Sequence, residues 1–363
     1  AGAAAPGRSV SGTPAAGTAA RPVLVLRNPA ATLTLDLAGG SLADFHLLGH
    51  PLNPLAWNTP AAADAGIRGF GHFVCLDRWG PPSEAEGARG MPYHGEASRV
   101  AWQVDQSPRP GPGRVEAVMS ARLPLAGLAV RRTIRLSDSQ ALALVREEVT
   151  NENPLGRILN LVQHPTIAPP FLDPSTRVDC NGRRGFAQGN PGPHPEEPST
   201  WWPTALNRDG VAVNLRHLTI DPQPNVVSYV IDDPLGWVTA ATPAQGLLIG
   251  YGWRTADYPW VSLWRDVRDG KPAARGLEFG TTGLHQPFPV LARQGRLWGR
   301  PLFEHLDAGE TLVRSYVVFL VRIPADFRGV ETVGLEGRRW TIRETGPGQP
   351  RVFNLEVADG LLP

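Results

Sequence analysis

The sequence is short of cysteine, with Cys75 and Cys180 as the only two thiols in 363 residues. Two cysteines are too few for a disulfide framework or a zinc cluster; they could form one bridge in an oxidising compartment or remain two free thiols. Long apolar runs are also missing, because a spanning helix needs roughly 20 consecutive apolar residues. The strongest run, at 316–321, is bounded by Arg314 and Arg322. We therefore expect a soluble chain without a membrane partner.

An excess of charge of one sign is absent as well, and so are the common local motifs. Lys plus Arg number 35 and Asp plus Glu 34, with a formal net charge of +1 and no basic run. Such a balance offers no footprint for a phosphate backbone, so nucleic acid is not expected as a partner. HxH, HExxH, CxxC, GxSxG, P-loop and strand-borne GxGxxG patterns are not found. The sequence therefore predicts neither a metal site nor a nucleotide cofactor.

What the sequence does contain is alternation with a period of two. Forty Gly and 37 Pro interrupt any long helix and supply turns. Between these turns, "ATLTLDL" places Leu33, Leu35 and Leu37 on one face of a strand, and "RVAWQV" at 99–104 has the same pattern. Similar runs continue to the end of the chain, which indicates an all-β protein.

The chain has no evident linker after its first segment. Residues 1–21 are small, polar and rich in Pro and Gly, as in a flexible arm, and the sequence starts at Ala1. We expect residues 22–363 to form a single domain of stacked, large antiparallel sheets, and we favour export over a cytoplasmic location. Two long loops, at 77–92 and 181–203, are expected to border the binding site.

Three polar residues at the edges of apolar segments are candidates for chemistry. His94 precedes Gly95, which permits a tight backbone and close approach by a ligand. His164 ends the run "ILNLVQ" before Pro165, and Glu278 alternates with apolar neighbours in "GLEFGTT". A buried carboxylate beside an imidazole can form an acid/base pair. The competing interpretation is that the histidines are structural and that the glutamate faces solvent.

The order of several segments resembles the aldose 1-epimerase (galactose mutarotase) superfamily. These segments are "LTLDLAGGSLADFHLLGHPLNPL", "YHGEASRVAWQV", "NLVQHPTI", "GLEFGTT" and "LDAGETLVRSYVVFLV", and the likeness spans roughly residues 30–322. The resemblance implies the large antiparallel β-sandwich of that family, the galactose mutarotase-like supersandwich. It implies His164 as general acid toward the ring oxygen, Glu278 as general base at the anomeric hydroxyl, and His94 as a second imidazole that positions the sugar.

The resemblance also implies substrate contacts and a reaction. Arg78 and Trp264 are the nearest counterparts of two residues that contact the sugar. Asp232, Asp233 and Asp257 are all possible counterparts of the sugar-binding aspartate, and we take Asp233. The implied activity is the interconversion of α and β anomers of a monosaccharide or a sugar derivative by ring opening, without a cofactor. We expect His164 and Glu278 to face each other across a sugar-sized gap.

The sequence also departs from the family pattern. After His164 it reads "PTIAPPFLD" instead of a Phe-Asn-Leu segment, and His94 is followed by Gly-Glu. These departures leave the substrate open. They also leave two alternatives, a non-catalytic carbohydrate-binding protein and a lyase or hydrolase on a related sandwich fold.

Overall fold

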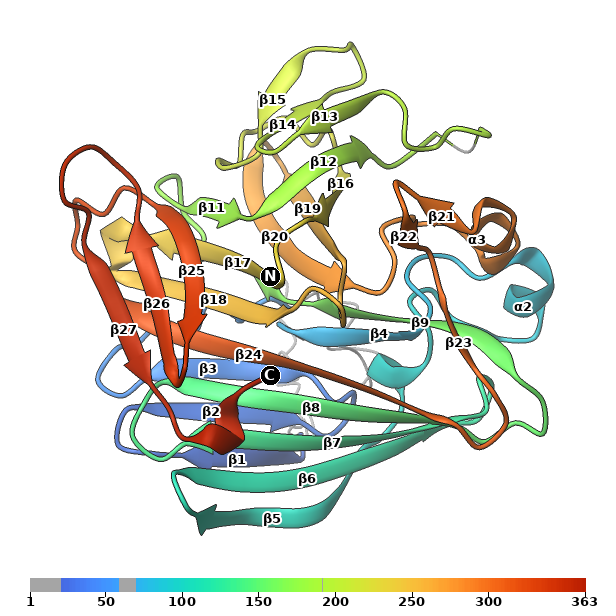
Figure 1. The fold of residues 1–363 in the computed structure, drawn as a ribbon, viewed down its shortest axis with the longest axis horizontal. Helices are drawn as coiled ribbons and strands as arrows, with labels where there is room; N and C mark the ends of the chain where they lie inside the picture. The colour runs from blue at the N-terminus through green and yellow to red at the C-terminus, as the bar shows by residue number, and fades with distance from the viewer. Residues whose placement is uncertain (1–20, 59–69, 191) are drawn as a thin grey trace, which may run out of the picture.

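The computed structural model describes residues 21–58, 70–190 and 192–363. The N-terminal arm expected at 1–21 lies, except for Arg21, outside these residues, so the proposed domain boundary stays a prediction. No helix in the described part of the chain is long and apolar enough to cross a membrane. Every pairing between named strands in this part is antiparallel, and two large sheets dominate (Figure 1).

The first large sheet has nine strands in the order β13-β12-β16-β19-β20-β9-β23, with β10 paired to β20 and β4 paired to β9. Their bounds are Phe73–Asp77 (β4), Arg157–His164 (β9), Thr166–Ile167 (β10), Gly182–Ala187 (β12), Ser199–Trp201 (β13), Val226–Ile231 (β16), Trp260–Arg268 (β19), Lys271–Gly280 (β20) and Glu304–Leu306 (β23).

The second large sheet has eight strands in the order β11-β17-β18-β24-β8-β7-β6-β5. Their bounds are Gln103–Gly111 (β5), Arg114–Leu123 (β6), Leu128–Ser137 (β7), Leu142–Asn151 (β8), Arg177–Cys180 (β11), Leu235–Thr242 (β17), Leu247–Arg254 (β18) and Thr311–Arg322 (β24).

Smaller elements surround the two sheets. Two three-stranded sheets are formed by Val23–Arg27 (β1), Ala31–Asp36 (β2) and Leu42–Leu47 (β3), and by Val330–Glu336 (β25), Arg339–Glu344 (β26) and Val352–Glu356 (β27). Two hairpins are formed by Thr204–Leu206 (β14) with Ala212–Asn214 (β15), and by Arg296–Leu297 (β21) with Arg300–Pro301 (β22). Within the described residues the helices are Glu84–Ala88 (α2) and Phe288–Gln294 (α3), and the 3₁₀ turns are Ala97–Arg99 (η1), Pro243–Gln245 (η2) and Asp359–Leu361 (η3).

The alternation read from the sequence decides how these layers pack. On β24, Tyr316, Val318 and Leu320 enter the main core between the two large sheets, whereas Val317 and Phe319 enter a second core beneath β25–β27. Figure 1 shows β25–β27 as a separate layer at one end of the molecule, with α2 and α3 at the other end. A strand that is apolar on both faces is therefore covered on both sides. The prediction of an all-β fold with large stacked antiparallel sheets is confirmed.

Some local expectations were wrong. The segment 99–104 begins with η1 and enters β5 only at Gln103, so Trp102 is buried while Val104 is 38% exposed. The segment 181–203 is not one long loop, because it contains β12 and β13. Cys75 and Cys180 are both buried and unpaired, which settles the choice between one bridge and two thiols.

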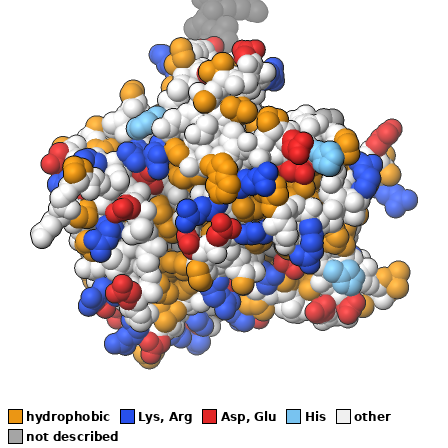
Figure 2. Space-filling model, turned by 45° about the horizontal axis from the view of Figure 1, so that its top comes forward, with side chains coloured by type: hydrophobic (Ala, Val, Ile, Leu, Met, Phe, Trp, Pro, Cys, Tyr) orange, Lys and Arg blue, Asp and Glu red, His pale blue; other side chains and the backbone are white. Residues whose placement is uncertain are grey.

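The surface shows no gathering of charge of one sign on the face seen in Figure 2. Acidic and basic side chains are interspersed there with exposed hydrophobic ones. A phosphate backbone requires several basic side chains on one stripe. That nucleic acid is not a partner stays a prediction.

Candidate active site

Strand pairing brings the two central candidates together. Phe279 pairs with Gln163 across β20 and β9, so Glu278 comes to lie beside His164, where β9 ends before Pro165. On β20, Leu277 and Phe279 enter the main core, and Glu278 therefore projects from the opposite face of the sheet, as its alternation predicted. We call this opposite face the site face.

The two side chains are in direct contact. His164 Nε2 lies 3.2 Å from Glu278 Oε1, and the residues are 5% and 1% exposed. The expected sugar-sized gap between them is not present. Direct contact is nevertheless compatible with an acid and a base that act on one carbon, because O1 and O5 of a pyranose are both bonded to C1.

Further hydrogen bonds hold each member of the pair. Trp79 Nε1 donates to Glu278 Oε2 at 2.6 Å, and His164 Nδ1 lies 2.8 Å from Thr166 Oγ1. The Thr166 hydroxyl donates to the carbonyl oxygen of His164 at 3.2 Å. A methyl group at Gly276 would lie 3.1 Å from Glu278 Oε1, so the absence of a side chain there leaves room for the carboxyl group.

Burial controls the protonation of the pair. It raises the pKa of Glu278 to about 8, an increase that the Trp79 hydrogen bond partly opposes. It lowers the pKa of His164 to about 3. Both shifts disfavour the charged forms, as expected when a carboxyl and an imidazole leave water. Burial therefore favours the uncharged forms of both side chains, in which one proton on Glu278 can be shared with His164.

His94 stands beside this pair on the segment after α2. Its ring centroid is 5.6 Å from that of His164, and its Nδ1 accepts from the backbone N–H of Gly80 at 2.9 Å. Burial, followed by the nearby imidazoles of His164 and His285, holds the pKa of His94 well below its ordinary value. The neutral ring therefore carries its proton on Nε2, where it can donate a hydrogen bond to an oxygen.

The glycine after His94 has the tight backbone expected from the sequence. Gly95 has a φ of 76°, and a Cβ there would lie 2.2 Å from the carbonyl oxygen of Leu76. Gly95 thus permits a close approach to the backbone of β4, and the expected approach by a ligand stays a prediction.

Aromatic rings surround the acid/base pair. Phe73 stacks on His164 with centroids 4.2 Å apart, and the partly buried Trp264 lies edge-on to His164 at 5.7 Å. Trp57 packs against both Phe73 and Trp264. Flat apolar faces beside hydrogen-bonding groups suit a pyranose, which has apolar C–H faces and polar edges. Trp264 was the tryptophan preferred from the sequence, and the structure places it at the site.

His285 completes the group of imidazoles and was not predicted. Its Nε2 lies 3.0 Å from the hydroxyl oxygen of Tyr93, and its ring meets Trp79 edge-on at 4.6 Å. Gly80 makes room for it, because a Cβ at this position would lie 3.0 Å from three atoms of the His285 ring. Burial lowers the pKa of His285 to about 4. No periodic pattern marked His285 or Trp79, since both lie in irregular segments after strands.

Arg78 and Asp233 are not brought into this group. The Arg78 guanidinium donates to Asp77 and to Glu86, whose Oε2 is 2.6 Å away, and it lies over the Phe288 ring. Consecutive residues of an extended chain point in opposite directions, so Trp79 faces the site while Arg78 faces α2.

Asp233 lies in the turn after β16, where its carboxylate accepts from Asn181. The two other aspartates considered are also paired elsewhere, Asp232 with Arg300 and Asp257 with Arg254. The described residues around His164 and Glu278 thus include no aspartate in hydrogen-bonding contact with the pair.

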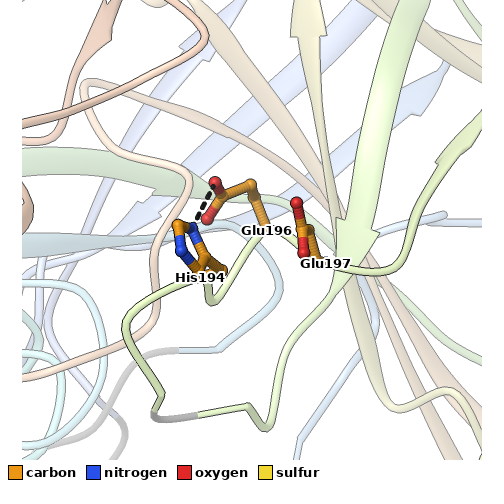
Figure 3. A group of neighbouring side chains, drawn as sticks. All are labelled: His194, Glu196 and Glu197. Carbon is orange, nitrogen blue, oxygen red and sulfur yellow. Dashed lines mark ion pairs between the residues drawn. The ribbon is translucent and has the colours of Figure 1, made fainter.

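One group of potential metal ligands occurs within the described residues, on the loop between β12 and β13. His194, Glu196 and Glu197 have ligand atoms within 4.8 Å of one another, and His194 Nδ1 is 3.7 Å from Glu196 Oε1 (Figure 3). His194 and Glu197 are exposed. Exposed acidic groups of this kind are common on protein surfaces, and none of the three is hydrogen-bonded to His164 or Glu278.

Comparison with known proteins identifies the fold. No protein-family model and no curated protein sequence matches the chain. Among solved structures, a galactose mutarotase-like protein of Lactobacillus casei is similar at 15% identity and a TM-score of 0.60, over 83% of this chain and 100% of the other. A galactose mutarotase-related enzyme of Lactobacillus acidophilus is similar at 12% identity and a TM-score of 0.60, over 83% of this chain and 98% of the other. A galactose mutarotase-like protein of Clostridium acetobutylicum is similar at 10% identity and a TM-score of 0.59, over 82% of this chain and 95% of the other. The chain has the galactose mutarotase-like fold.

Proposed function

We propose that this chain interconverts the α and β anomers of a sugar by acid/base ring opening. The observation that carries the proposal is the buried contact between His164 and Glu278 on the site face of the sheet. Fold likeness at this level of identity supports the proposal only as an analogy. The chemical argument for the proposal comes from the contact between His164 and Glu278.

The proton count of the pair fits the reaction. Ring opening removes a proton from O1, delivers a proton to O5, breaks the C1–O5 bond and leaves C1 as an aldehyde. Transfer of the shared proton from Glu278 to His164 yields a carboxylate that can take the O1 proton and an imidazolium that can protonate O5. Rotation about C1–C2 and reversal of these steps give the other anomer and restore the pair.

The surrounding groups fit the binding of a sugar. The neutral His94 can donate its Nε2 proton to a hydroxyl oxygen, and Trp264 offers a flat face. The proposal does not include Arg78 or Asp233, because their side chains are engaged elsewhere. It needs no cofactor.

The test is anomer exchange measured by NMR over a panel of free aldoses and uronates. The expected result is exchange faster than in buffer for at least one sugar, abolished in His164→Ala and Glu278→Gln. His305→Ala and Glu148→Gln are matched controls, because His305 is exposed on β23 and Glu148 pairs with Arg131 on the second large sheet. Unchanged exchange in either site variant would refute the assignment.

Two outcomes would favour the alternatives. Saturable sugar binding by calorimetry without faster exchange would indicate a carbohydrate-binding protein. Release of new reducing or unsaturated ends from a polysaccharide would indicate a hydrolase or lyase, since a mutarotase cannot release either.

A further inference from the structure

The acid/base pair is the middle of a longer chain of polar contacts, in which hydrogen bonds flank a close approach of Glu278 to His164. The chain runs from Trp79 Nε1 to Glu278 Oε2 at 2.6 Å, and from Glu278 Oε1 to His164 Nε2 at 3.2 Å. It continues from His164 Nδ1 to Thr166 Oγ1 at 2.8 Å and from Thr166 Oγ1 to the His164 carbonyl oxygen at 3.2 Å. Trp79, Thr166 and Glu278 are at most 1% exposed, so water has little access to these groups.

The two ends of this chain fix its direction. An indole N–H can only donate a hydrogen bond, and a backbone carbonyl can only accept one. The single hydroxyl proton of Thr166 is used on the carbonyl oxygen, so Oγ1 must accept from His164 Nδ1–H. His164 Nε2 is then left with a lone pair facing Glu278 Oε1, while Oε2 is occupied by the Trp79 proton.

The opposite direction would be costly. If the Thr166 hydroxyl donated to His164 Nδ1, the ring proton would lie on Nε2, and Nε2–H would face an ionised Glu278. The pair would then carry a net negative charge at a buried position, which is unfavourable without a compensating cation. No ion pair from an arginine or lysine of the described residues reaches Glu278, whose one ion-pair partner there is His164.

We propose that Thr166 and Trp79 are positioning residues that fix the tautomer of His164 and confine the mobile proton to the space between Glu278 Oε1 and His164 Nε2. The catalytic consequence rests on the proposed function, whereas the tautomer does not. Thr166 acts through His164 and Trp79 acts through Glu278. The sequence pattern did not single out either of these two side chains.

Thr166 offers a near-isosteric test. Its backbone N–H bonds to the Gly71 carbonyl, and this bond does not depend on the side chain. Thr166→Val keeps the shape and removes the hydroxyl, whereas Thr166→Ser keeps the hydroxyl. Trp79→Phe removes the N–H at the other end of the chain, although it also leaves a cavity that could weaken the fold. The threonine variants keep the proposal testable if Trp79→Phe does not fold.

The direct measurement is ¹⁵N NMR of the histidine rings in the full chain, with His164 assigned by the signals that disappear in His164→Gln. We expect Nδ1–H with an unprotonated Nε2 in the wild type and in Thr166→Ser. Thr166→Val should shift His164 toward the Nε2–H tautomer. A wild-type His164 protonated on Nε2 alone, or a tautomer unchanged in Thr166→Val, would overturn the proposal.

Kinetics supply the second readout. Loss of one hydrogen bond to the acid/base pair should lower kcat about tenfold in Thr166→Val with little change in KM, and Thr166→Ser should restore it. An equal loss in both variants would contradict a role of the hydroxyl. If the wild type accelerates no anomer exchange, the proposed function fails, while the NMR result still decides the tautomer.

Discussion

Glu278→Gln should make the protein more stable than the wild type, and increasingly so as the pH rises. The amide oxygen can accept from Trp79 Nε1, and the amide N–H can donate to His164 Nε2, so glutamine reproduces the protonated carboxyl group. Unlike glutamate, it cannot ionise in the buried site. The variant therefore isolates the cost of ionising Glu278.

The magnitude follows from the pKa shift. Burial raises the pKa of Glu278 from its ordinary 4.5 to about 8 in the folded protein. A raised folded-state pKa contributes stability at low pH that is lost as the pH rises from 4.5 through 8. At about 1.4 kcal/mol per pKa unit, the advantage of the glutamine variant is roughly 1 kcal/mol at pH 5, about 3 at pH 7 and about 5 at pH 9.

Urea denaturation of the wild type and Glu278→Gln at pH 5, 7 and 9 measures this difference. Subtracting the two free energies of unfolding at each pH removes the contribution of the other titrating groups. Glu148→Gln is the control, because Glu148 is partly exposed beside arginines and should change stability little at any of the three pH values. A difference between wild type and Glu278→Gln that stays constant with pH would refute the neutral-pair reasoning. It would show instead that the pKa of Glu278 is the same in the folded and the unfolded protein.

Three further results are expected. Exchange activity should fall as the pH rises through about 8, because the pair then loses the proton shared by Glu278; a pH–rate profile checks this. Gly276→Ala should lower kcat by roughly tenfold or more while the protein still folds, since the added methyl group meets Glu278 Oε1 at 3.1 Å and Trp264 Cβ at 3.0 Å; wild-type kcat would contradict the geometry. Cys75 and Cys180 should resist iodoacetamide in the native protein and react after denaturation, because both thiols are buried and burial raises their pKa; rapid native labelling seen by mass spectrometry would contradict their burial.

The fold was largely predictable because alternation reports burial directly. Leu33 and Leu35 are buried as their pattern requires, and Glu278 points away from Leu277 and Phe279. The pairing of β9 with β20 was not readable in the same way. It joins residues more than 100 positions apart, and nothing local to either strand specifies its partner.

The candidate site shows the same limit at the level of single residues. Thr166 could have been found, since it lies two positions after His164 and residues i and i+2 of an extended chain share a face. The helix α2 also had a signal, the capping box formed by Ser83 and Glu86. Trp79 and His285 had none, because irregular loops have no period from which to infer direction.

The central claim is tested most directly by the NMR anomer-exchange rate of the best sugar, measured with wild type, His164→Ala and Glu278→Gln at pH 6.5 and equal protein concentration. The account predicts acceleration by the wild type and a rate equal to that of buffer for both variants. A wild-type rate equal to buffer across the whole panel, or full activity in either variant, would contradict it.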